Sequence, residues 1–154
     1  INLEINFKNG KQDGIVKEYY ENGKLKQEGN YKNEKAEGIL KYYSENGKLK
    51  QETQYKNGKL EGIEKLYRKN GKLKQEGNYK NEKAEGIFKW YYENGKLSQK
   101  VNYKNGKKEG LLIMYYKNGE YGYIDTYKNG IKINRKSYTK EGKLEFDQDY
   151  PYLE

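Results

Sequence analysis

The stretch NGKLKQEGNYKNEKAEGI occupies positions 22–39, and the same letters return unchanged at positions 70–87. The shift of 48 residues is twice a shorter period, because Asn-Gly recurs every 24 residues. These Asn-Gly pairs stand at 22–23, 46–47, 70–71, 94–95 and 118–119. A second turn signal, Asn followed by Gly or Glu, recurs with the same period from Asn9 to Asn129. Self-similarity at a fixed period of roughly 20–50 residues is typical of repeat proteins.

Apolar and aromatic residues follow the same period. Leu, Ile, Val and Phe make up only about 18% of the 154 residues, a fraction typical of disordered chains. The 19 tyrosines and the order of the apolar residues indicate a folded chain instead. They form columns: Ile15, Ile39, Ile63, Ile87 and Leu111; Tyr19, Tyr43, Tyr67, Tyr91 and Tyr115; Phe7, Tyr31, Tyr55, Tyr79, Tyr103 and Tyr127.

Each repeat contains two segments of strand length between turn signals. Asn-Gly favours a two-residue hairpin turn, because both residues of a type I′ turn have positive φ. Placing that turn at Asn22-Gly23 pairs Glu21 with Lys24 and Lys17 with Glu28, so opposite charges face one another. A three-residue bulged turn is the competing register. We favour the two-residue turn.

The other connection carries Glu34 and Glu82 in two repeats where a type I′ turn favours Gly, so we interpret it as a longer loop. This loop ends at glycines that we expect to have positive φ: Gly14, Gly38, Gly62, Gly86 and Gly110. The predicted fold is all-β, an elongated antiparallel meander of stacked β-hairpin repeats with about thirteen strands. We predict one repeat domain over 1–154, with a half repeat at 1–8, repeats over 9–134 and a degenerate C-terminal cap at 135–154.

Composition excludes several kinds of site. The chain has no Cys and no His, which excludes disulfides, zinc sites built from these ligands, and His- or Cys-based catalysis. A Glu column recurs once per repeat, but carboxylates two strands apart are separated by about 10 Å, too far to share a proton or a metal ion. No apolar run is long enough to span a membrane. We therefore expect no enzyme activity, no catalytic residues, no metal and no cofactor.

Two stretches, Tyr55–Gly62 and Tyr103–Gly110, read Tyr-Lys-Asn-Gly-Lys-x-Glu-Gly, and residues 42–49 read YYSENGKL. A hairpin unit of 24 residues with these motifs resembles the MORN repeat in its bacterial variant form. The resemblance extends from residue 1 to about residue 146. The chain departs from the standard repeat because it lacks a Gly-x-Gly pair and because two units carry Glu in place of Gly.

The resemblance implies a sheet of stacked hairpins that attaches to proteins or to membrane surfaces. Some bacterial members act as antitoxins or immunity partners, so toxin neutralisation is among the implied functions. Some members carry a phosphatidylinositol-phosphate kinase label, which does not fit this chain. No glycine-rich phosphate loop or kinase catalytic loop is present here.

Some columns change from repeat to repeat, whereas structural columns of a repeat protein stay uniform. By strand alternation these variable columns share one face of the sheet. An aromatic and Met patch of this kind is typical of interface anchors, although core variation or self-association is the competing interpretation. The candidate protein-binding face is Tyr42, Leu66, Phe88, Trp90, Tyr92, Met114 and Tyr116.

Lysines also recur with the period, and the chain has a net charge of +9. They predict a face for anionic lipid, or simply a solvated face, because glutamates are interleaved with them. Nucleic acid is disfavoured because arginine, the better phosphate reader, occurs only at Arg68 and Arg135. The candidate anionic-surface face is Lys24, Lys48, Lys72 and Lys96.

The sequence thus predicts a non-enzymatic scaffold for protein–protein interaction, with toxin neutralisation or self-association as its purpose. The expected partner is another protein or a second copy of the chain. The alternative is peripheral attachment to an anionic membrane or envelope surface. The resemblance implies a bacterial protein, located in the cytoplasm, or in the envelope or outside the cell if a signal peptide precedes Ile1.

Overall fold

The computed structural model describes residues 2–151, so Ile1 and the last three residues of the predicted cap, 152–154, lie outside the described residues. The described chain contains fourteen strands and no helix. The strands are β1 (Asn2–Lys8), β2 (Lys11–Tyr19), β3 (Leu25–Lys32), β4 (Lys35–Tyr43), β5 (Leu49–Lys56), β6 (Lys59–Tyr67), β7 (Leu73–Lys80), β8 (Lys83–Ala84), β9 (Gly86–Tyr91), β10 (Leu97–Lys104), β11 (Lys107–Tyr115), β12 (Tyr121–Lys128), β13 (Ile131–Tyr138) and β14 (Leu144–Asp149).

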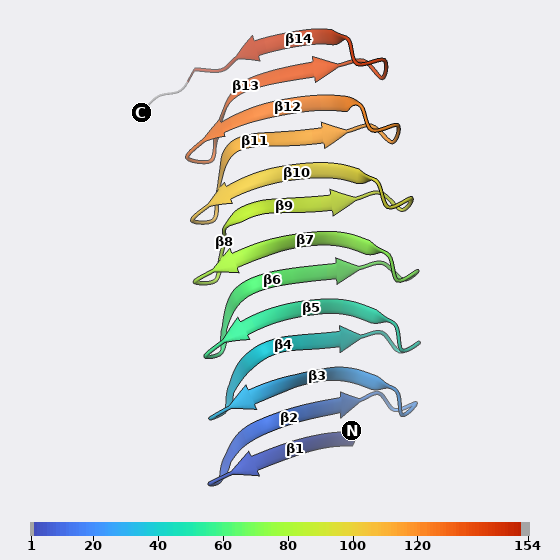
Figure 1. Ribbon diagram of the computed structural model, residues 1–154, viewed down its shortest axis with the longest axis vertical. Helices are drawn as coiled ribbons and strands as arrows, with labels where there is room; N and C mark the ends of the chain where they lie inside the picture. The colour runs from blue at the N-terminus through green and yellow to red at the C-terminus, as the bar shows by residue number, and fades with distance from the viewer. Residues whose placement is uncertain (1, 152–154) are drawn as a thin grey trace. The chain divides into compact units, whose positions relative to one another are not determined.

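The strands form an open antiparallel meander (Figure 1). Thirteen of them are ordered in the sheet as they are in the sequence, and the two-residue β8 pairs with β7. The predicted all-β fold of stacked hairpins is confirmed. Backbone contacts divide the chain into unit 1, Ile1–Leu73 with Tyr79–Glu82, and unit 2, Lys74–Asn78 with Lys83–Glu154.

The connection that we expected to be a longer loop is a tight two-residue turn. Asn33 and Glu34 have φ of 48° and 66°, and Lys32 pairs directly with Lys35. Positive φ at both central residues is the mark of a type I′ turn. The Glu34 amide also donates to the Gln12 carbonyl at 2.8 Å, a bond to the preceding repeat that offsets the unfavourable φ.

The Asn22-Gly23 turn is the three-residue bulged type, so the predicted two-residue turn is wrong. The Tyr20 amide donates to the Lys24 carbonyl at 2.8 Å, and the Gly23 amide donates to the Tyr20 carbonyl at 2.9 Å. A bulge between Glu18 and Tyr19 then shifts the register. Beyond the bulge Lys17 pairs with Glu28, as the charge pattern predicted.

The glycines after the tight turns have positive φ as predicted, 81° at Gly38 and 108° at Gly62. The register of β3 against β4 shifts between Glu28 and Asn30, which face Lys41 and Glu37. Ile39 lies in this irregular stretch and is 54% exposed. The Ile column is therefore a surface feature in both units, with every member about half exposed.

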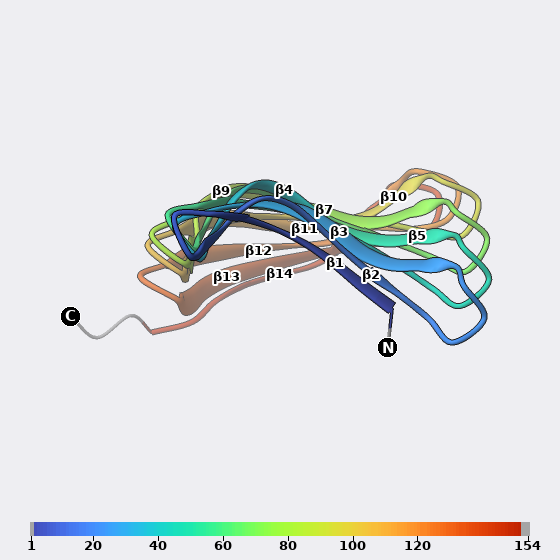
Figure 2. The ribbon, with the colours of Figure 1, turned by 90° about the horizontal axis from the view of Figure 1, so that it is seen from below.

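The buried side chains lie in a row on the opposite side of the sheet. They are Val16, Leu40, Phe88, Val101 and Leu112, together with Thr53 and Asp125. We call this side the front face and the side of the Ile column the back face. Within each unit the strands run side by side between two rows of turns (Figure 2), and within residues 2–151 no second layer covers either face.

Replacing Glu34 by Gly is expected to stabilise unit 1 by about 1 kcal/mol, because a side chain at positive φ carries a steric cost that Gly avoids. The free energy of unfolding from urea denaturation measures the effect. The reciprocal variant, Gly58→Glu, places a side chain at φ 78° in the equivalent turn and should destabilise by a similar amount. Equal stability of Glu34→Gly and the parent chain would contradict this explanation of the turn.

Candidate functional site

The predicted protein-binding residues of unit 2 are partly buried and partly accessible. Phe88 is only 3% exposed, and its ring packs edge-on against Tyr103 with 5.0 Å between ring centroids. The Trp90 ring lies 6.1 Å from the Phe88 ring and is intermediate in exposure. Phe88 is therefore buried on the front face, whereas the Trp90 side chain is accessible from solvent.

Trp90 and Met114 come from different strands and flank the same residue. Gln99 of β10 pairs with Trp90 of β9 on one side and with Met114 of β11 on the other. Met114 is also intermediate in exposure. Because directly paired residues point to the same side of a sheet, Trp90, Gln99 and Met114 form one continuous stretch of the front face. We call Trp90 and Met114 the unit 2 patch.

Tyr92 and Tyr116 begin the three-residue turns of unit 2. The Tyr92 hydroxyl donates to the Tyr115 carbonyl, and the Tyr116 hydroxyl donates to the Tyr138 carbonyl at 3.0 Å. Each hydroxyl thus binds the backbone of the following repeat. These two tyrosines border the unit 2 patch and connect successive turns.

The predicted residues of unit 1 have a more polar setting. Tyr42 and Leu66 both pair with Gln51, so they flank it as Trp90 and Met114 flank Gln99. The Gln51 amide donates to Thr53 Oγ1 at 2.9 Å and to Glu64 Oε1 at 3.0 Å. This hydrogen-bond network makes the front face of unit 1 polar where that of unit 2 is aromatic.

The predicted anionic-surface lysines lie at the three-residue turns and are all exposed. The backbone amide of each lysine donates a hydrogen bond to the side chain of the Asn two residues earlier. In the first of these bonds the Lys24 amide donates to Asn22 Oδ1 at 3.0 Å. The equivalent bonds hold Lys48, Lys72 and Lys96. Lys96 Nζ lies 3.4 Å from the Asn118 carbonyl oxygen.

A second set of lysines, outside the predicted anionic-surface face, lies at the other row of turns. Lys32 pairs with Lys35 across the type I′ turn, and like charges directly opposite one another are unfavourable. This facing of like charges was one reason to expect a longer loop here, and the structure shows that the tight turn forms in spite of it. The same facing pairs occur at Lys8 and Lys11, at Lys56 and Lys59, and at Lys104 and Lys107.

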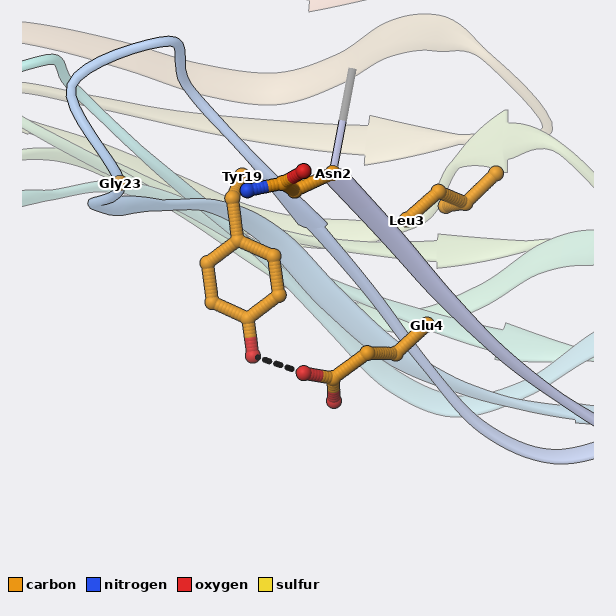
Figure 3. A pocket seen from close by; sticks show the side chains of 5 residues that line it. All are labelled: Asn2, Leu3, Glu4, Tyr19 and Gly23. Atoms are coloured by element: carbon orange, nitrogen blue, oxygen red, sulfur yellow. Dashed lines mark hydrogen bonds between the residues drawn. The ribbon is translucent and has the colours of Figure 1, made fainter.

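The back face carries a ladder of tyrosine–glutamate hydrogen bonds that the sequence pattern did not reveal. The Tyr43 hydroxyl donates to Glu28 at 2.7 Å, and the Tyr91 hydroxyl donates to Glu76 at 2.6 Å. Figure 3 shows the first member, Tyr19 with Glu4, beside a hollow at β1. A Tyr and a Glu separated by 15 residues in four successive repeats, from Glu4 and Tyr19 to Glu76 and Tyr91, were the available signal.

This ladder predicts a loss of stability in alkali. Burial, together with the bonds to Glu28 and Glu76, raises the pKa of Tyr43 and of Tyr91 to about 12. An unfolded tyrosine ionises near pH 10, so the contribution is complete below about pH 10 and is lost as the pH rises to about 12. The urea midpoint should fall over this range, and less steeply in a Tyr43→Phe, Tyr91→Phe double variant. Equal pH dependence of the two proteins would contradict this role.

The Glu column connects the tight turns of successive repeats. Glu37 Oε2 accepts a hydrogen bond from the Asn57 amide at 2.8 Å, and Glu85 Oε2 accepts one from the Asn105 amide at 2.8 Å. These carboxylates therefore have a structural use as caps of positive-φ turn residues. Among residues 2–151 no group of three acidic side chains is placed to hold a metal ion. The described chain also contains no helix with the length and hydrophobicity of a membrane span.

The comparisons agree with the repeat period. The sequence model described as MORN repeat variant matches four tandem stretches, residues 12–33, 36–57, 60–81 and 84–105, which together exceed half of the chain. Each stretch contains one hairpin with a three-residue turn. No curated protein matches the chain. One similar solved structure, titled "Crystal structure of GtfA/B complex", shares 16% identity over 68% of this chain, with a TM-score of 0.30, and the chain spans 18% of its length.

Proposed function

Because this chain belongs to the MORN repeat variant family, whose repeats build scaffolds, we propose that it is a non-enzymatic scaffold that binds another protein. The binding surface in this proposal is the unit 2 patch, Trp90 and Met114, on the front face. The partner contributes an apolar surface of its own.

One observation carries the proposal. Trp90 and Met114 share the front face with the buried side chains Phe88, Val101 and Leu112, which we call the floor and whose exposures are 3%, 0% and 5%. No second layer formed by residues 2–151 covers this face. Aromatic residues and Met at the centre of a surface patch, above a packed floor, are the usual anchors of protein interfaces. Toxin neutralisation and self-association remain within this proposal as two kinds of partner.

The test compares variants that keep the floor intact. We expect the double variant Trp90→Ala, Met114→Ala to lose at least about 30-fold in affinity for a captured partner. Loss of one anchor residue, at about 2 kcal/mol or more, is enough for this change. Ile87→Ala, which removes a 46% exposed side chain from the back face of the same strand, should bind normally. A partner held equally by both variants would overturn the assignment of this surface.

A second candidate function is attachment to an anionic surface through the lysines at the turns. It is favoured by the facing Lys32–Lys35 and Lys56–Lys59 pairs, whose mutual repulsion an anion would relieve. Binding to phosphatidylserine vesicles should then be strong at low salt and lost at high salt. Replacing Lys32, Lys35, Lys56 and Lys59 with Gln should remove it, whereas the patch variants should not.

A further inference from the structure

One position in the repeat has a feature that the protein-binding proposal does not use. Five three-residue turns begin at the same column of the repeat, which holds Tyr20, Ser44, Arg68, Tyr92 and Tyr116. All three tyrosines donate the hydroxyl to the backbone of the next repeat: Tyr20 to the Tyr43 carbonyl at 2.7 Å, Tyr92 to the Tyr115 carbonyl and Tyr116 to the Tyr138 carbonyl. A tyrosine in this column thus connects its own turn to the backbone of the next repeat through its hydroxyl group.

Ser44 cannot make the equivalent contact because its side chain ends at Oγ. That oxygen stays within its own turn, 2.7 Å from Asn46 Oδ1 and 2.9 Å from the Lys48 carbonyl oxygen. By the repeat, a tyrosine at this position would reach from residue 44 toward the Tyr67 carbonyl. Its ring would pass residue 50, since the Tyr116 ring lies 3.7 Å from a Cβ placed at the equivalent residue, Gly122.

A hollow occupies this place in the structure. It has a volume of about 610 Å³ and is lined by Ser44, Leu49, Lys50, Tyr67 and Arg68, among others. The volume is in the range of about 300–1,000 Å³ that is usual for ligand pockets. The hollow is therefore the space that the repeat fills with its own tyrosine elsewhere. We call it the Ser44 pocket.

The lining indicates which ring would fit. Leu49 offers an apolar wall, and Tyr67 also lines the pocket. By the repeat period, its carbonyl corresponds to the carbonyls that accept the phenol hydroxyl in the other repeats. Three cationic side chains, Lys50, Arg68 and Lys69, line the pocket against one anionic side chain, Glu45. This excess of positive charge favours acidic residues on either side of the ring.

We propose that the Ser44 pocket receives a tyrosine side chain of a protein partner, flanked in the partner's sequence by acidic residues. The incoming ring replaces the tyrosine that this repeat lacks, and its hydroxyl donates to the Tyr67 carbonyl. The inference rests on the proposed function in that the partner is a protein. It does not depend on the unit 2 patch.

The test is a titration of the whole chain, followed by NMR, with the acetylated and amidated tripeptide Glu-Tyr-Glu. We expect shifts at residues of the Ser44 pocket, and roughly fivefold weaker binding of Glu-Phe-Glu, because one net hydrogen bond is lost. Lys-Tyr-Lys should bind more weakly than either peptide. Equal affinity for the Tyr and Phe peptides, or no binding of Glu-Tyr-Glu at millimolar concentration, would overturn the proposal.

Two substitutions at one position provide the matched comparison. Ser44→Tyr should fill the pocket, abolish binding of Glu-Tyr-Glu and raise the melting temperature, whereas Ser44→Ala leaves the pocket open and should bind as the parent chain does. Binding that persists in a folded Ser44→Tyr variant would place the peptide elsewhere. The Trp90→Ala, Met114→Ala variant should bind the tripeptide normally, so a failure of the unit 2 patch and a failure of the pocket are distinguishable.

Discussion

Replacing Asp125 by Ala is expected to lower the free energy of unfolding by about 2 kcal/mol. Asp125 is 2% exposed and accepts two hydrogen bonds from Arg135, from Nε at 2.6 Å and from Nη2 at 2.7 Å. The guanidinium also lies 4.3 Å above the Tyr123 ring. The Arg135 side chain is 32% exposed, so water solvates its charge once the carboxylate is gone. The loss is therefore that of hydrogen bonds to a charged group, about 1.5–3 kcal/mol.

The position of Asp125 in the sheet explains why an acid is tolerated there. It pairs with Leu112 on β11 and with Arg135 on β13, at the end of the buried row of unit 2. An apolar residue, Val101, holds the corresponding place one repeat earlier. Arg135 thus lies at the end of the buried row, and the Asp125 carboxylate neutralises its charge.

Urea denaturation of three variants tests this role. Asp125→Ala should show the full loss, while the double variant Asp125→Val, Arg135→Leu should recover most of it, because an apolar pair can replace a buried ion pair. Lys136→Ala breaks the exposed pair between Lys136 and Asp147, 3.3 Å apart, and should change stability by less than about 1 kcal/mol. An Asp125→Ala variant as stable as Lys136→Ala would contradict the capping role.

The repeat period and the strand pairing could be predicted from the sequence because both depend on local, repeated signals. Lys17 facing Glu28 followed from the register of the two-residue turn and is confirmed, because the bulge between Glu18 and Tyr19 restores that register beyond the three-residue turn. The turn types were exchanged because Asn-Gly occurs at both turns. The structure places the type I′ turn where the second residue is Glu in two repeats, as at Glu34, and the amide of that residue bonds to Gln12 of the preceding repeat. Such contacts between repeats are not visible in one hairpin.

The division into core and surface was the less predictable part. Uniformity of the Ile column suggested a structural role, but Ile39 is 54% exposed beside the positive-φ Gly38. Variation at Leu40 and Phe88 suggested recognition, but both are 3% exposed. Leu40 and Phe88 each pack over a glycine of the neighbouring strand, Gly29 and Gly77, and this relation can be seen only when the register is known.

Replacing Gly77 by Ala is expected to destabilise unit 2 by about 2 kcal/mol, although Ala is normally the better strand residue. A Cβ at Gly77 would lie 2.2 Å from two atoms of the Phe88 ring, so the buried ring would have to move. Overpacking of this kind costs about 1–3 kcal/mol. Gly122→Ala, where the nearest atom would be 3.6 Å away, should be nearly neutral and serves as the control.

The double variant distinguishes packing from recognition. Phe88→Ala alone should cost about 3–5 kcal/mol because it leaves a cavity. In Gly77→Ala, Phe88→Ala the new methyl group enters the space that the ring vacates, so the combined cost should be less than the sum of the single costs by at least about 1 kcal/mol. Additive costs would mean that Phe88 does not fill the space above Gly77. Coupling would show that residue 88 varies to fit the neighbouring strand, and would leave Trp90 and Met114 as the variable residues of unit 2 that are free to meet a partner.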